Sequence, residues 1–109
     1  MKRILCLAVS SLIAPAAISF AGDASALWNQ NCASCHGKDG SGSTMMGKKL
    51  NVKDYRDAKV QAAFTDSEAE KAIADGVKEN GKQVMKPSKE KFSEADIKAL
   101  VAHLRSLKK

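Results

Sequence analysis

The residues best suited to chemistry form one short run, with Cys32, Cys35 and His36 in the order Cys-x-x-Cys-His. Two thiols three positions apart can each add to one vinyl group of a haem. The histidine directly after the second thiol can then bind the iron through a ring nitrogen. This spacing is the attachment signature of c-type haem. The run therefore predicts one covalently attached haem c, with Cys32 and Cys35 as attachment sites and His36 as the proximal axial iron ligand.

Three other uses of these groups stay open from the residues alone. A zinc site would use the same atoms, but beyond the first 21 residues only His103 remains as a further Cys or His, so the usual second pair of ligands is absent. A thioredoxin-type dithiol needs a βαβ setting, whereas this chain has helical periodicity. A disulfide between Cys32 and Cys35 would close a very small loop and stabilise little.

A haem iron either takes a sixth ligand or keeps an open position. Met85 is the best-placed ligand, because it lies in a segment that follows an apolar helix and precedes Pro87 by two residues. A thioether held there can close over the far face of the ring. Methionine paired with histidine raises the reduction potential. We predict Met85 as the distal axial ligand, and the alternative is that Met85 only fills a packing gap.

The other donors are expected to do something else. Met45 and Met46 follow His36 too closely to reach the opposite face of the ring, so we expect them to line the pocket. His103 lies at the edge of an apolar helix face, which favours a packed, hydrogen-bonded residue over a ligand.

Helical periodicity dominates the chain. A first helix is predicted from Asp23, a good N-cap, to Asn31, and a short helix over 57–64. Overlapping capping boxes at Thr65 and Ser67 start a third helix that stops at Asn80-Gly81. Ser93 caps the last helix, whose apolar face extends to residue 107.

The segments between these helices carry glycine, proline and polar residues. The stretches 37–47 and 81–92 are predicted to be loops, and Gly76 to lie on the buried stripe of the third helix, where a flat group could pack closely. We find no convincing strand, repeat or second domain. The prediction is an all-α fold of three to four short helices around one haem.

The first 21 residues have the layout of a secretory signal. Lys2 and Arg3 precede an apolar stretch, and Ser19-Phe20-Ala21 offers small residues at the two positions that a signal peptidase recognises. The stretch is short for a membrane anchor. We therefore expect residues 1–21 to be cleaved, residues 22–109 to form a single mature domain that carries the haem, no membrane span to remain, and the location to be periplasmic.

The charge favours acidic protein partners. The formal net charge is +6, and the loss of Lys2 and Arg3 with the signal leaves +4. No basic patch interleaved with aromatic residues indicates a nucleic-acid binder. We expect a monomer that meets acidic docking surfaces of redox proteins transiently, through a rim of exposed lysines: Lys38, Lys48, Lys49, Lys82, Lys86 and Lys89.

Over almost its whole predicted mature length the sequence resembles class I monohaem cytochromes c. The matching pieces are Ala26-Leu27-Trp28 before the first cysteine, the Cys-Ala-Ser-Cys-His-Gly run, Ile73-x-x-Gly76 before a methionine, and the apolar pattern of the last helix. The resemblance implies that the first and last helices cross, that Trp28 packs against the last helix, and that His103 occupies a packing position.

One departure from the family concerns the proximal histidine. Relatives often carry a proline after the Cys-x-x-Cys-His run, and its carbonyl accepts the proton on the far nitrogen of the histidine. This sequence has no proline between Pro15 and Pro87. We expect a carbonyl somewhere in 47–50 to replace it, since metal-bound histidines nearly always have such a partner.

These features predict a single-electron carrier and not an enzyme. An iron held on both faces is closed to substrates and needs little atomic motion when its charge changes. Tyr55 and Arg56 are candidate partners of the haem propionates. The rival function is a haem enzyme or ligand sensor with an open or displaceable sixth position, and the sequence offers no distal His or Arg–His pair that would favour it.

Overall fold

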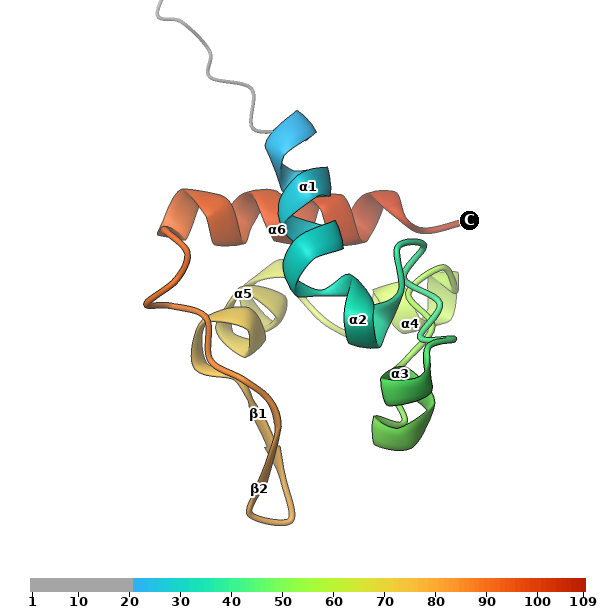
Figure 1. Ribbon diagram of the computed structural model, residues 1–109. Coiled ribbons are helices and arrows are strands. Elements are labelled where there is room, and N and C mark those ends of the chain that lie inside the picture. The colour runs from blue at the N-terminus through green and yellow to red at the C-terminus, as the bar shows by residue number, and fades with distance from the viewer. Residues whose placement is uncertain (1–20) are drawn as a thin grey trace, which may run out of the picture.

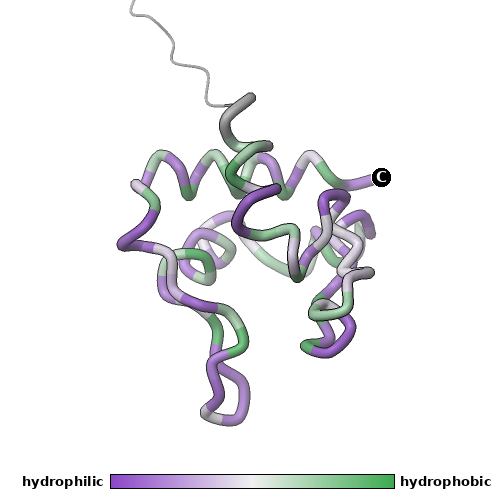
Figure 2. Tube along the Cα trace, in the orientation of Figure 1, coloured by the Kyte–Doolittle hydropathy of each residue, from purple (hydrophilic) through white to green (hydrophobic). Residues whose placement is uncertain are grey.

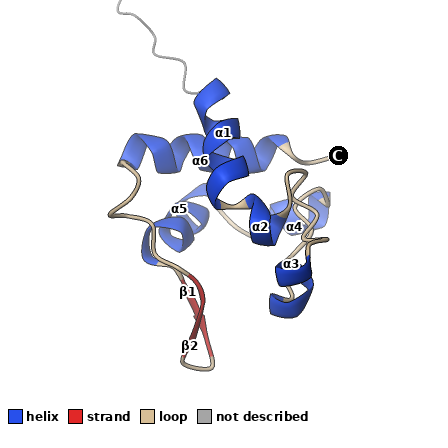
Figure 3. Ribbon diagram, in the orientation of Figure 1, coloured by secondary structure: helices blue, strands red, loops and turns tan. Residues whose placement is uncertain are grey.

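The computed structural model describes residues 21–109, so the predicted signal lies outside the described residues except for Ala21. Helices dominate this part of the chain, and the only strands there form one hairpin (Figures 1 and 3). None of its helices is long and apolar enough to cross a bilayer. The elements are α1 (Ala21–Asn31), α2 (Ala33–His36), α3 (Met45–Leu50), α4 (Ala58–Ala62), α5 (Asp66–Asp75), β1 (Val77–Glu79), β2 (Lys82–Met85) and α6 (Glu94–Ser106).

The first and last helices cross, as predicted (Figure 1). Trp28 of α1 is 3 % exposed and Leu100 of α6 is fully buried in one apolar core. Burying a large apolar side chain stabilises a fold by about 1.5–3 kcal/mol, so this crossing anchors the domain. The remaining core members come from α5, α6 and the segment before α6: Ala69, Ile73, Phe92, Ile97, Val101 and Leu104.

Capping fixes where the two longer C-terminal helices begin. The Thr65 hydroxyl accepts a hydrogen bond from the Glu68 backbone N–H, and the Glu68 carboxylate accepts one from the Thr65 N–H. Ser93 and Asp96 form the same reciprocal pair at the start of α6. Both pairs satisfy backbone donors that a helix start otherwise leaves free. The N-cap predictions at Thr65 and Ser93 are confirmed.

The third predicted helix is too long, and the absence of strands is wrong. Helix α5 ends at Asp75, and Gly76 adopts a positive φ of 77°. Asn80 and Gly81 then both have positive φ, at 53° and 76°, between the antiparallel strands β1 and β2. An Asn-Gly pair with two positive φ angles favours a tight hairpin turn. The Asn80-Gly81 pair therefore connects two strands and does not end a helix.

The predicted loop over 37–47 contains the start of a further helix, α3. The Thr44 hydroxyl caps it by accepting from the Gly47 N–H at 2.8 Å. Asn51 ends it in the left-handed conformation, with φ of 56°. Glycine content suggested a loop, but a threonine cap and an asparagine stop enclose one helical stretch between them.

Candidate functional site

The Cys-x-x-Cys-His run folds as a single helical turn directly after α1. The Cys32 carbonyl accepts a hydrogen bond from the His36 N–H at 2.9 Å, and the Ala33 carbonyl accepts one from the Gly37 N–H at 2.8 Å. Both cysteines are free thiols and partly buried. The structure thus brings together the two predicted attachment sites and the predicted proximal ligand on one turn.

The surroundings of the thiols argue against a redox dithiol. Burial, with a smaller contribution from Cys35, raises the pKa of Cys32 to about 11. Reactive dithiols instead have a lowered thiol pKa, because the thiolate is the nucleophile. Among residues 21–109 no three side chains of His, Cys, Asp or Glu converge as a metal site, which also disfavours zinc. The environment of Cys32 therefore favours a protonated thiol over a reactive thiolate.

The His36 imidazole is partly buried, and its surroundings favour the neutral form. Burial lowers its pKa below the usual value, and a neutral imidazole is the form that binds a metal. Its Nδ1 atom is buried and has no hydrogen-bond partner in the described part of the chain. The predicted carbonyl partner in 47–50 does not fill this role: the Gly47 carbonyl accepts from the Val52 N–H at 2.9 Å.

Two aromatic rings lie close to His36. Its ring centroid lies 5.6 Å from that of Trp28 and 5.6 Å from that of Tyr55. The Trp28 indole N–H donates to the Gly37 carbonyl at 2.9 Å, which ties α1 to the residue that follows the histidine. Trp28, predicted as a helix-packing residue, therefore also contacts the candidate iron ligand.

Helix α3 packs closely on the turn that carries Cys32, Cys35 and His36, called the attachment turn below. The Thr44 hydroxyl donates to the Cys35 carbonyl at 2.7 Å. A Cβ atom built on Gly47 would collide with the Cys35 and Gly42 carbonyl oxygens. Glycine at position 47 thus allows α3 to approach the backbone of Cys35 closely and to support the second thiol.

Met85 lies at the end of β2 and is partly buried. It packs against the same apolar core as Cys32, although the two residues come from distant parts of the chain. Met45 and Met46 are 87 % and 42 % exposed, so neither side chain is buried in the fold. Of the methionines in the described residues, only Met85 combines partial burial with contact to the core that holds the attachment turn.

Gly76 positions Met85, and G76A tests this. A Cβ atom at Gly76 would overlap the Met85 carbonyl oxygen and lie 2.6 Å from the Gln83 side-chain nitrogen. A residue with a side chain is also strained at a φ of 77°. We expect G76A to destabilise the protein by about 1–3 kcal/mol, measured by urea denaturation of the holoprotein. The matched control is G81A, because Gly81 has a φ of 76° and no neighbour near a Cβ atom. G81A should show the backbone strain of a positive φ without an overlap between the Cβ atom and its surroundings. Equal losses in the two variants would contradict a positioning role for Gly76.

His103 packs as predicted, but its hydrogen bonding differs from the prediction. Its ring centroid lies 5.4 Å from that of Trp28, at the crossing of α1 and α6. Its Nε2 atom is buried and has no hydrogen-bond partner in residues 21–109. The prediction of a packing residue is supported, whereas the expected hydrogen bond at Nε2 is absent from this part of the chain.

The partly buried His103 ring predicts a pH effect on stability. Burial lowers the pKa of the folded His103 below its usual 6.5, so the unfolded chain takes up the proton first as the pH falls. The contribution of neutral His103 to the free energy of unfolding is complete above about pH 6.5 and is lost progressively below that pH. We expect H103Y to lose less stability than the wild type between about pH 6.5 and 5, in urea titrations of the holoprotein. Parallel stability curves for the two proteins would contradict this.

The candidate propionate partners have different surroundings. Arg56 forms an ion pair with Asp54 at 2.9 Å and lies 3.7 Å from Asp39. The Arg56 hydrogen bond holds the pKa of Asp54 below its usual value. Arg56 is thus engaged with neighbouring carboxylates, while Tyr55 faces His36.

A haem fits the chemistry of this region. A porphyrin is large and mostly apolar, and partly buried hydrophobic residues line the core next to the attachment turn. The orphaned Nδ1 of His36 and the two free thiols match a ligand and attachment set for one haem. The partly buried residues are Leu27, Cys32, Ala33, Tyr55, Phe64, Ala74, Met85 and Leu107.

Sequence reasoning missed Gln61. It is 5 % exposed, and its side-chain amide donates to the Tyr55 carbonyl at 2.7 Å and to the Leu104 carbonyl at 2.9 Å. A glutamine in a short helix of mixed polarity gives no sequence signal for burial, because its partners lie on other elements.

Comparison with known proteins agrees with this geometry. The family model "Cytochrome c" matches residues 21–108. The solved structure of the KustC0563 c-type cytochrome is similar, with a TM-score of 0.71 and 35 % identity over 79 % of this chain and 98 % of that one. A tyrosine-to-phenylalanine mutant of Kustc0563 gives a TM-score of 0.69 and 35 % identity, covering 79 % of this chain and 99 % of that one. No curated protein sequence matches the chain.

The match spans almost all described residues, and the Cys-x-x-Cys-His turn, the crossing of α1 and α6 and the mostly helical fold all lie within it. The predictions of a cytochrome c-like fold and of haem c as the cofactor are confirmed. The chain belongs to the cytochrome c family, whose members carry covalently bound haem c.

Proposed function

We propose that this protein is a periplasmic carrier of single electrons whose haem is attached through Cys32 and Cys35 and ligated by His36 and Met85. The observation that carries the proposal is the convergence of Cys32 and Met85 on one apolar core from opposite parts of the chain. Such an arrangement provides a donor for each face of the ring. The family supports electron transfer in general, and these residues supply the specific ligand set.

The chain's own contribution is to hold both donors still. The lowered pKa of His36 leaves a ring nitrogen unprotonated and available to bind the iron, and Met85 is fixed at the base of the hairpin by the close approach of Gly76. The bound haem supplies the redox-active iron. A soft thioether opposite an imidazole favours the reduced state and raises the reduction potential. Rigid ligands keep the geometry the same in both oxidation states, so electron exchange is fast.

A basic rim directs the choice of partner. All six lysines of the rim are exposed: Lys38, Lys48, Lys49, Lys82, Lys86 and Lys89. Within residues 21–109, only Lys89 of this set forms an ion pair, with Asp75 at 3.7 Å. Unneutralised lysines beside the attachment turn and the hairpin attract acidic protein surfaces and accelerate encounter. We propose transient complexes between this protein, as a monomer, and acidic redox partners.

Export places the protein in the compartment where c-type haem would be attached. The basic start, apolar stretch and small-residue site of 1–21 support cleavage before Gly22. Helix α1 begins at Ala21, so this cleavage leaves the helix nearly whole. N-terminal sequencing of the protein from the periplasmic fraction should start at Gly22, and an intact signal in that fraction would contradict the proposal.

One spectroscopic experiment tests the ligand set. The purified holoprotein should show sharp α and β bands when reduced and a weak near-infrared band of iron–sulfur ligation when oxidised. Carbon monoxide should not bind the reduced native protein. Carbon monoxide binding without denaturant would instead favour the rival function, a ligand sensor or enzyme with an open sixth position.

A second experiment tests the basic rim. Reduction by an acidic redox protein should slow steeply as ionic strength rises, because salt screens exposed charges beyond about 8–10 Å. Reduction by a neutral small molecule serves as the control and should change little. An equal salt response for the two reductants would refute electrostatic docking.

A further inference from the structure

Within the described part of the chain, no hydrogen bond from the ring of His36 fixes its orientation. A metal-bound histidine usually donates its second ring N–H to a carbonyl or carboxylate, which fixes the rotation of the ring. The Nδ1 atom of His36 is buried and has no such partner among residues 21–109. Its rotation must then be set by the groups packed against the ring.

Two aromatic rings provide that packing. Trp28 lies against His36 at an interplanar angle of 36°, and Tyr55 lies against it at 50°, both with centroids 5.6 Å away. Trp28 is fixed by its deep burial and by the hydrogen bond to the Gly37 carbonyl. The remaining freedom of the His36 ring depends on how firmly Tyr55 is held.

Tyr55 is held through its backbone and its ring edge. Its N–H donates to the Gly40 carbonyl at 2.8 Å, and its carbonyl accepts from the Gln61 amide at 2.7 Å. Its ring meets Phe64 edge-on, with centroids 5.8 Å apart and an interplanar angle of 87°. Gln61 and Phe64 therefore form the support behind Tyr55.

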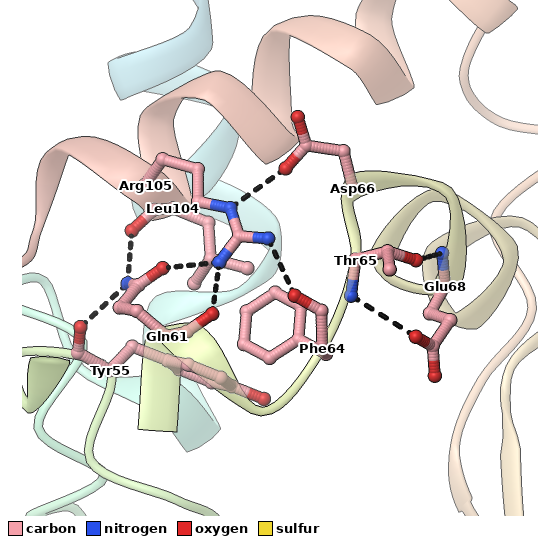
Figure 4. Close-up of polar contacts among 8 residues, drawn as sticks. All are labelled: Tyr55, Gln61, Phe64, Thr65, Asp66, Glu68, Leu104 and Arg105. Atoms are coloured by element: carbon pink, nitrogen blue, oxygen red, sulfur yellow. Dashed lines mark hydrogen bonds and ion pairs between the residues drawn. The ribbon is translucent and has the colours of Figure 1, made fainter. Parts of the chain in front are cut away.

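Arg105 fixes both of these supporting residues (Figure 4). Its guanidinium donates to the Gln61 side-chain oxygen at 3.0 Å and to the Phe64 carbonyl at 2.8 Å. It also lies over the Phe64 ring, 4.2 Å from the centroid, and pairs with Asp66 at 2.7 Å. The planar fork of arginine can make these contacts together, whereas lysine cannot.

We propose that Gln61 and Arg105 are positioning residues that set the rotation of the His36 ring through Tyr55. The inference rests on the proposed function, in which His36 binds the haem iron. It explains why a buried polar residue and an arginine fork from α6 converge behind a ring that itself touches His36. Rotation of the imidazole, together with the orientation of the distal thioether, determines how unpaired spin is distributed over the haem in the oxidised state.

The direct test removes the Tyr55 ring and then restores it. Proton NMR of the oxidised holoprotein reports imidazole rotation through the order and spread of the haem methyl resonances. We expect Y55L to change that order and spread, and Y55F to retain the wild-type pattern because it keeps the ring. A wild-type pattern in Y55L would overturn the proposal, as would an equal change in Y55F and Y55L.

The indirect test acts on the support and leaves the ring unchanged. R105L removes the fork, and K98L removes the same charge from an exposed position on the same helix. We expect R105L to shift the haem methyl resonances in the direction seen for Y55L, and K98L to leave them in place. Equal shifts in R105L and K98L would show a charge effect and overturn the positioning role. An unchanged spectrum in R105L would also overturn it.

The controls separate this inference from the proposed function. The mass of each denatured variant reports covalent haem, and the near-infrared band reports the distal thioether. Loss of either in the wild type would refute the proposed function. With both retained in wild type and variants, the methyl pattern decides whether Tyr55 and Arg105 orient His36.

Discussion

Alanine at both Cys32 and Cys35 is expected to abolish covalent haem completely. Each thiol would supply one thioether link, and no other cysteine lies among the described residues. The denatured double variant should have the mass of the polypeptide alone, and acid–acetone should remove any pigment that remains. A further loss is expected in folding, because a domain of this size gains little from its own core without the cofactor.

Single variants and a neighbouring substitution complete the test. C32A and C35A should each keep one link and give a protein of intermediate stability. Ser34 lies between the two thiols, and S34A should retain the full haem mass because serine forms no thioether link to haem. A haem increment that survives the double variant would show that attachment occurs elsewhere in the chain.

Alanine at Met85 is expected to have the second-largest effect. Removing the thioether should eliminate the near-infrared band, lower the reduction potential and open the sixth position to carbon monoxide. Haem attachment should persist, because the turn formed by Cys32, Cys35 and His36 is unchanged. Absorption spectra, a redox titration and carbon monoxide binding measure these three effects.

The other methionines serve as matched controls for Met85. M45A and M46A remove a thioether of the same chemistry from positions that are 87 % and 42 % exposed. Both variants should retain the band and the wild-type potential. If M46A removes the band and M85A does not, the distal ligand lies on α3 instead of the hairpin.

Sequence patterns predicted the parts of the site that depend on neighbouring residues. The order Cys-x-x-Cys-His carries haem chemistry within five positions, and the structure forms it as one turn. Thr65 and Ser93 begin helices because their hydroxyls reach a backbone N–H three residues ahead. The ligand roles of His36 and Met85 remain predictions with favourable positions.

The errors arose where one signal has two meanings. Asn80-Gly81 can end a helix or connect two strands, because both structures need positive φ angles there. Here the pair connects strands β1 and β2, because the helix has already ended before Gly76. Met85, on the second strand, packs on the core. Helix α3 was missed because glycine content outweighed its caps at Thr44 and Asn51.

The sequence by itself determined the cofactor and the class of fold and identified the Cys-x-x-Cys-His run, because these follow from bonds and periodicities that span only a few residues. The tertiary structure alone decided which groups surround His36. The Gln61 amide meets the Leu104 carbonyl across a separation of 43 residues, and Trp28 and Tyr55 reach one imidazole from different elements. Such contacts depend on how helices pack against each other, and no local pattern encodes that packing.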